Sequence, residues 1–197
     1  RVNEVHDATQ QGNVRLNAEI GRVLEAGLQM SADASNLVAA LKGDAQQRGA
    51  WGEAQLRRTL ELGGLVEGDH FIEQGSFRDG EGRLKQTDFL ICLPDDKHLV
   101  IDSKVTLNAY ARLVEADSQE GRQQALAEHV RAVRRHIDDL AGKDYSGLPA
   151  LNSPGLVLMF MPVEPAFIEA LRHDPALYDY GYRKNIVLVS HTTLIPV

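Results

Sequence analysis

The stretch that decides the fold consists of two segments joined by a turn, Thr87-Asp88-Phe89-Leu90-Ile91-Cys92-Leu93 and His98-Leu99-Val100-Ile101-Asp102-Ser103-Lys104. Both are largely apolar and contain β-branched or aromatic side chains, as strands do. The residues between them, Pro94-Asp95-Asp96-Lys97, are typical of a turn, because proline fixes φ and aspartate hydrogen-bonds to its own backbone. The sequence therefore predicts a β-hairpin over residues 84–105.

The pairing of this hairpin determines which charged side chains meet. Side chains alternate along a strand, so Val100, Asp102 and Lys104 share one face. A loop of about three to five residues makes paired residue numbers sum to about 190–192 and sets Asp88 opposite residue 102, 103 or 104. An even sum places Asp88 on the face of Asp102 and Lys104, whereas an odd sum requires a bulge to do so.

Two carboxylates and a lysine in the middle of a sheet indicate a metal-dependent site. Neighbouring carboxylates repel each other unless a cation intervenes, and Mg²⁺ binds one or two carboxylates while keeping waters for a phosphate. Glu53, at the start of the preceding helix, is a third acidic candidate. The alternatives are a cross-strand ion pair of Asp88, Asp102 and Lys104 on a solvated face, and for Glu53 a carboxylate that meets the helix dipole.

The rest of the chain predicts a mixed sheet flanked by helices, of the α/β or α+β class. Periodic apolar residues predict helices over 48–62, 107–114, 121–140 and 166–172 and the start of another at 191. Strands are predicted at 70–74, 156–161 and 186–189, and the last two are uniformly apolar, as in a sheet buried on both faces. Residues 44–197 form the predicted domain. Residues 1–43 carry a thin apolar stripe, typical of a coiled coil or of one helix packed on that domain.

Composition excludes several classes of protein. The 197 residues hold 21 Lys and Arg against 28 Asp and Glu, a net charge of −7 that argues against non-specific coating of nucleic acid. The single cysteine, Cys92, excludes a disulfide scaffold and a cysteine-built zinc site. The sequence contains no apolar run of the roughly 18 residues that a membrane span requires. Because the chain opens with Arg1 rather than Met, we expect it to be a fragment.

One predicted helix is locally basic. It carries Arg131, Arg134 and Arg135, and Lys143 follows it. Lysine and arginine supply most of the affinity of proteins for the DNA backbone, so these four residues are candidates for phosphate contact. The alternative is a solvated helix face balanced by neighbouring aspartates.

Several motifs in order resemble known families. Asp88, the hairpin, the Asp102-x-Lys104 pair and an upstream Glu53 resemble the PD-(D/E)xK nuclease superfamily. More specifically, the chain is similar to the RmuC family, and the resemblance is carried by residues 49–53, 93–95, 100–105, 109–110 and 160–167, with agreement at 143–145 and 185–190. One departure is Thr87-Asp88, since the superfamily usually has Pro-Asp there.

The resemblance implies a restriction-endonuclease-like core with an N-terminal coiled coil, and a Mg²⁺- or Mn²⁺-dependent deoxyribonuclease that acts in DNA recombination or limits DNA rearrangement. Asp88 and Asp102 would be metal ligands, Lys104 the catalytic lysine and Glu53 an accessory acid. It further implies DNA as partner, self-association through the coiled coil, a cytoplasmic location with a membrane-anchored parent, and a continuation beyond residue 197. The alternative function is a scaffold that binds DNA or protein without turnover.

Overall fold

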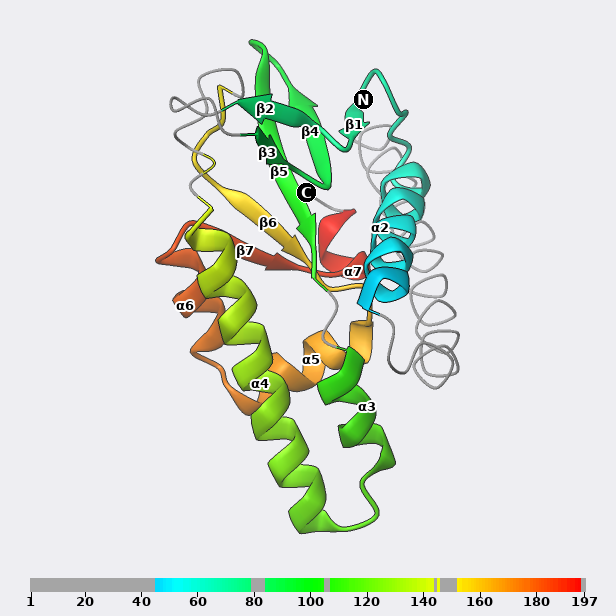
Figure 1. The fold of residues 1–197 in the computed structure, drawn as a ribbon, viewed down its shortest axis with the longest axis vertical. Coiled ribbons are helices and arrows are strands. Elements are labelled where there is room, and N and C mark those ends of the chain that lie inside the picture. Colours follow the sequence, from blue (N-terminus) through cyan, green and yellow to red (C-terminus); the bar gives the residue numbers. More distant parts are fainter. Residues whose placement is uncertain (1–44, 79–83, 105–106, 144, 146–151, 196–197) are drawn as a thin grey trace, which may run out of the picture.

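A five-stranded mixed sheet forms the centre of the computed structural model, which describes residues 45–78, 84–104, 107–143, 145 and 152–195 (Figure 1). The strand order is β1-β4-β5-β6-β7, and β2 and β3 form a separate two-stranded ladder. The strands are β1 (Phe71–Glu73), β2 (Ser76–Arg78), β3 (Leu84–Gln86), β4 (Phe89–Leu93), β5 (Lys97–Ser103), β6 (Val157–Phe160) and β7 (Ile186–Val189). The helices are α2 (Ala45–Leu62), α3 (Leu107–Glu115), α4 (Gln119–Ala141), α5 (Glu164–His173), α6 (Leu177–Tyr182) and α7 (His191–Leu194). The predicted mixed sheet flanked by helices is confirmed.

The central hairpin pairs in the predicted register. β4 and β5 are antiparallel, from Phe89 opposite Ile101 to Leu93 opposite Lys97, so that paired numbers sum to 190. In the turn between them, Asp95 and Asp96 adopt positive φ values of 62° and 53°, which aspartate tolerates better than most residues. Continuing this register by one residue sets Asp88 opposite Asp102.

The hairpin is shorter than predicted, because residues 84–86 do not belong to it. They form β3 and pair with β2 in the separate ladder. The chain changes partner at residues 87–88, where the Thr87 amide donates to the Gly75 carbonyl and the Gln74 amide donates to the Asp88 carbonyl. The polar run from Lys85 to Asp88 crosses this break, and no proline or glycine marks it, so the sequence did not reveal it. Helix α6 was also missing from the prediction.

Helices cover both faces of the sheet. Val100, Met159 and Leu188 pack with apolar residues of α4, whereas their neighbours in the same strands, including Ile101 and Leu158, pack with those of α2 and α7. Figure 1 shows α2 and α4 on opposite sides of the sheet. Strand β6 is buried at every position, as its uniformly apolar sequence predicted.

Three parallel strands bring their carboxyl ends to one edge of the sheet. β5 pairs with β6 and β6 with β7 in parallel, through crossovers that contain α3–α4 and α5–α6. At this edge the buried Glu164 accepts hydrogen bonds from Ser190 Oγ (2.9 Å) and Thr192 Oγ1 (2.7 Å). Glu164 therefore fastens α5 to α7, and the structure gives it a role in packing.

The predicted coiled coil over residues 1–43 lies outside the described residues. Among the helices that the structure describes, none combines the length and hydropathy needed to cross a bilayer.

Gly181 allows α6 to lie directly against the chain that enters β7. A Cβ at this position would lie 2.8 Å from the Ile186 carbonyl oxygen, which belongs to the backbone and cannot turn away. We expect Gly181→Ala to lower the free energy of unfolding by about 1–3 kcal/mol through overpacking. Urea denaturation followed by circular dichroism measures this change.

Gly49→Ala is the matched control. Gly49 lies in α2, and a Cβ there would have no atom within 4 Å. Alanine favours a helix over glycine by about 1 kcal/mol, so the control variant should be as stable as the wild type or more stable. Equal destabilisation by the two substitutions would contradict the close approach at Gly181.

Candidate functional site

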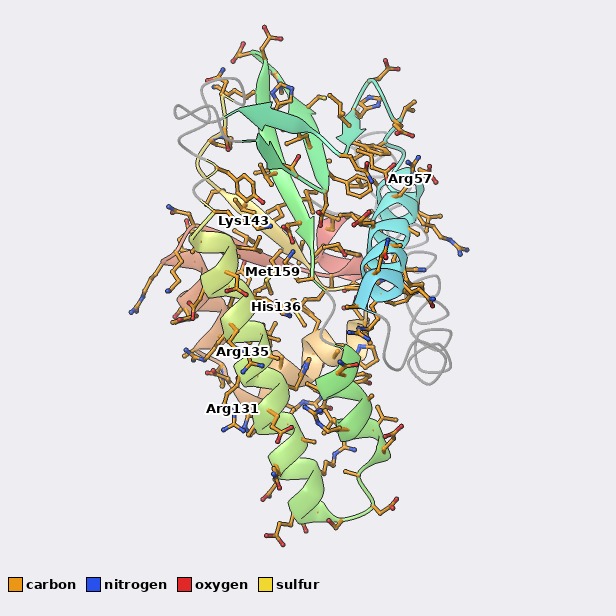
Figure 2. All side chains as sticks on the ribbon, viewed as in Figure 1. Arg57, Arg131, Arg135, His136, Lys143 and Met159 are labelled. Carbon is orange, nitrogen blue, oxygen red and sulfur yellow. The ribbon has the colours of Figure 1, made fainter. Side chains whose placement is uncertain are left out.

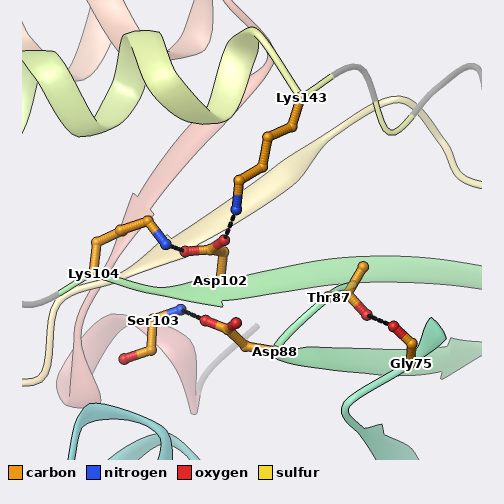
Figure 3. Close-up of polar contacts among 7 residues, drawn as sticks. All are labelled: Gly75, Thr87, Asp88, Asp102, Ser103, Lys104 and Lys143. Atoms are coloured by element: carbon orange, nitrogen blue, oxygen red, sulfur yellow. Dashed lines mark hydrogen bonds and ion pairs between the residues drawn. The ribbon is translucent and has the colours of Figure 1, made fainter. Parts of the chain in front are cut away.

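A buried carboxylate held by two lysines forms the centre of the site (Figure 3). The side chain of Asp102, near the end of β5, is only 1% exposed. Its Oδ2 accepts a hydrogen bond from Lys104 Nζ, and its Oδ1 accepts one from Lys143 Nζ at 2.9 Å. Lys104 follows on the same face of the strand, whereas Lys143 reaches Asp102 from just beyond the end of α4. Two cations thus balance an anion that would otherwise be very costly to bury.

The second carboxylate, Asp88, is bound to the same strand end. Its Oδ2 accepts the Ser103 amide at 2.8 Å. Burial raises the pKa of Asp88 to about 6, repulsion by Asp102 and Glu53 acts in the same direction, and the Ser103 amide and Lys104 oppose the shift. The structure therefore brings Asp88, Asp102 and Lys104 together, with Glu53 of α2 close enough to act on Asp88 electrostatically.

Lys143 lies where the sequence alone did not place it. It was predicted as a DNA contact, but its ammonium group bonds to Asp102. Burial lowers its pKa, yet the attraction of Asp102 and the hydrogen bond to it outweigh burial and leave the pKa above its ordinary value. Lys143 is seven residues beyond His136, which is itself seven beyond His129. Extending that helical spacing would have pointed Lys143 toward the sheet.

The two histidines of α4, His129 and His136, differ in role. Burial lowers the pKa of His136, and the nearby Lys104 lowers it further, so a neutral imidazole borders the site. His129 is completely buried, and its Nε2 bonds to the Ala166 carbonyl at 2.9 Å, which makes it a packing residue. Within the described part of the chain, no three His, Cys, Asp or Glu residues gather closely enough to hold a metal ion by themselves.

The predicted basic residues of α4 separate into two groups according to their contacts. Arg134 is occupied: its Nε and Nη2 donate to Asp174 Oδ2 at 3.0 and 2.6 Å, and its guanidinium lies 4.4 Å from the centre of the Tyr180 ring. Arg131 and Arg135 instead line an open hollow between α3 and α4. Geometry thus assigns Arg134 to packing and leaves Arg131 and Arg135 available to a ligand.

The charges of this arrangement determine which ligands would suit it. The three acidic side chains, Glu53, Asp88 and Asp102, face two lysines, which leaves one negative charge in excess when all are ionised. Carboxylate oxygens suit a hard divalent cation, and the ammonium groups suit the oxygens of a phosphodiester.

Comparison with known proteins gives one consistent result. A family model described as the RmuC family matches residues 1–197. The "DNA recombination protein RmuC homolog" of Pasteurella multocida is 54% identical over 197 residues, which are 100% of this chain and 39% of that protein. The homolog of Haemophilus influenzae is 52% identical over the whole chain and 44% of its own length. The "DNA recombination protein RmuC" of Escherichia coli K12 is 44% identical over 180 residues, 91% of this chain and 38% of that protein.

The chain thus spans about two fifths of the length of these curated relatives. No solved structure matches the chain.

The raised pKa of Asp88 predicts how stability depends on pH. The ionised form is disfavoured in the fold, so Asp88 reduces stability as the pH rises from about 3.8, its unfolded value, through about 6. Replacing it in Asp88→Asn removes this penalty and keeps an oxygen for the Ser103 amide. We expect the variant to be more stable than the wild type by roughly 1–2 kcal/mol at pH 8 and by little at pH 4. Urea denaturation at the two pH values measures the difference.

Asp138→Asn is the control with the opposite sign. Hydrogen bonds from Lys184 and Tyr180 lower the pKa of Asp138, so its ionised form is favoured in the fold. Its replacement should lower stability slightly at pH 8. An Asp88→Asn variant that is less stable than the wild type at both pH values would contradict the claim that ionised Asp88 destabilises the fold.

Proposed function

The chain belongs to the RmuC family, and we propose that it acts in DNA recombination as a metal-dependent nuclease that hydrolyses phosphodiester bonds at Asp88, Asp102 and Lys104. The names of its relatives include the words DNA recombination. Because the chain covers only part of those proteins, the activity of the whole protein is part of the proposal. We further propose that the core is of the PD-(D/E)xK type.

The observation that supports the proposal is the position of Asp88, a carboxylate with a raised pKa, opposite the buried Asp102. Lys104 follows Asp102 by two residues. Asp88 raises the electrostatic cost of the site, and so does Glu53. A purely structural ion pair would gain stability by losing one of these acids. Their joint presence is the expected cost of a site that binds a cation during function.

Mg²⁺ or Mn²⁺ fits the donor set in part. Asp88 uses only Oδ2, and its Oδ1 accepts no hydrogen bond from any described residue. The buried Ser103 Oγ also lacks a hydrogen-bond partner among the described residues, but it points away from the two carboxylates, so Ser103 contributes its amide alone to the site (Figure 3). Asp88 and Asp102 would hold the ion, and water and phosphate would complete its coordination, as Mg²⁺ prefers. For Asp102 to take part, one of its lysines must release an oxygen.

The residues of the chain would divide the work of hydrolysis. A bound divalent ion would supply Lewis-acid stabilisation of the charge on the phosphate. Lys104, whose Nζ bonds to Asp102 Oδ2, would donate a hydrogen bond to a phosphate oxygen or orient the attacking water. The water oxygen would bond to phosphorus and release a proton to the solvent, while the bond to the 3′ oxygen breaks and that oxygen takes up a proton. The products are a 5′-phosphate and a 3′-hydroxyl.

A scaffold without turnover is the second candidate function. The observation that favours it is the double engagement of Asp102, whose two oxygens both bond to lysines. In that case the same charges stabilise the fold, and the protein holds DNA or partner proteins, with self-association through residues 1–43.

Lys104→Ala separates the two functions. Wild-type chain is incubated with branched, single-stranded and duplex DNA, with Mg²⁺ or Mn²⁺ and with EDTA. We expect metal-dependent cleavage by the wild type and a loss of at least about 100-fold in the variant, the usual scale for a group that supports proton transfer or charge at the reacting atoms. Lys184→Ala removes an exposed lysine that pairs with Asp138 and should cleave normally. Binding of DNA without any cleavage would favour the scaffold.

The metal ligands have their own test. Asp88→Asn removes a charged oxygen donor, so we expect Mn²⁺ to bind at least about tenfold more weakly, since a lost ligand or its support costs that much. Calorimetry without DNA measures this affinity. Unchanged Mn²⁺ binding by Asp88→Asn would show that the ligand set is wrong, whatever the activity.

A further inference from the structure

A basic hollow lies between α3 and α4, outside the carboxylate site. It has a volume of about 590 Å³ and is lined by Ala109 and Arg112 of α3 and by Glu128, Arg131 and Arg135 of α4. Three guanidinium groups against one carboxylate give this small area a net charge of +2, in a chain whose net charge is −7. Such local excess is the electrostatic footprint of an anion-binding surface.

Two of the three arginines, Arg131 and Arg135, make no polar contact among the described residues that a bound anion would have to replace. Within the described residues, neither Arg131 nor Arg135 makes a hydrogen bond or an ion pair. This contrasts with Arg134 of the same helix and with Arg57 of α2, each of which is bound to carboxylates. Arg112 donates to Glu128 at 2.9 Å, and its side chain is 58% exposed, so it can turn to a stronger acceptor.

The lining indicates which anion the hollow takes. Guanidinium groups bind phosphate oxygens in a bidentate manner, better than ammonium groups do. Among the described residues that line the hollow, Ala109 is the only apolar one and none is aromatic, so these residues offer no surface on which a base could stack. The chemistry therefore suits a phosphodiester backbone read without regard to base sequence, rather than a free nucleotide.

The position of the hollow connects it to the carboxylate site. Figure 2 shows Arg131, Arg135, His136 and Lys143 following one another along α4 toward the sheet. Arg135 and Lys104 both act on the pKa of His136, which lies between the hollow and the site. Arg131 precedes the end of α4 by ten residues, a distance of about 15 Å at a rise of 1.5 Å per residue. This length corresponds to about four nucleotides of a strand in B-DNA.

We infer that the hollow formed by Arg112, Arg131 and Arg135 binds the phosphate backbone of a DNA strand that continues along α4 to Lys143 and Asp102. The inference rests on the proposed function in taking DNA as the ligand. It goes beyond it by assigning a second, non-catalytic site on α3 and α4, in which Arg112 takes part and Arg134 does not. Glu128 opposes the phosphate and restrains Arg112.

The test measures DNA binding in EDTA, so that it does not depend on cleavage. Fluorescence anisotropy of a labelled oligonucleotide, single-stranded or duplex, is recorded over a series of salt concentrations. Arg131→Gln/Arg135→Gln should weaken binding at least about tenfold and lower the slope of log affinity against log salt by about 1.4 for single strands and 1.8 for duplex. Glu128→Gln should strengthen binding several-fold, since it removes the opposing charge and releases Arg112.

The matched control is Arg172→Gln/Arg183→Gln, which removes two exposed arginines from α5 and the end of α6. It should bind DNA as the wild type does. Circular dichroism and thermal unfolding confirm that each variant is folded. Normal binding by Arg131→Gln/Arg135→Gln, equal loss in both double variants, or competition by polyglutamate as effective as that by unlabelled DNA would each overturn the inference.

The two proposals fail separately. If the wild type binds DNA through the hollow but does not cleave it with Mg²⁺ or Mn²⁺, the binding proposal stands and the nuclease proposal is refuted. Cleavage that persists while the arginine variants bind normally refutes the hollow alone.

Discussion

The interior position of the Asp102 carboxylate is the constraint on which the site depends. A buried charge costs several kcal/mol unless partners surround it, and removing one partner of such a pair typically destabilises a protein by about 3–5 kcal/mol. The partners here come from two places, Lys104 of the same strand end and Lys143 beyond α4. The ion pairs therefore connect the segment that follows α4 to the central strand β5. Asp88 and His136 lie close enough to the Asp102 carboxylate for it to act on both electrostatically.

The sequence allowed the central hairpin and its register to be predicted, for physical reasons that are local. A proline-aspartate turn limits the loop length, and the alternation of side chains then leaves few pairings that bury the apolar residues. The long apolar runs of β6 and β7 were equally informative, because only a strand covered on both faces tolerates them. These features predicted Asp88 opposite residue 102, 103 or 104, and the register in the structure selects Asp102.

What the sequence could not reveal depends on contacts between distant segments. Helix α6 has six residues, too few for a periodic pattern, and it is held by the close approach of Gly181 to Ile186. β3 leaves the hairpin because β2 offers it another partner. The sequence does not distinguish the arginines of α4 from one another. In the structure, Arg134 contacts Asp174 and Tyr180, whereas Arg131 and Arg135 face the solvent. Such differences arise only when the helices pack.

Helix α4 has a further mechanical consequence. It is one unbroken element of 23 residues, about 34 Å long, and it carries the arginines of the hollow on the same rigid rod that ends at Lys143. The arginine hollow and Lys143 cannot move independently, because a tilt of α4 that shifts one of them also shifts the other. A DNA strand bound at the arginine hollow would reach Lys143 after a fixed distance, so the length of α4 would set the number of nucleotides between the two sites.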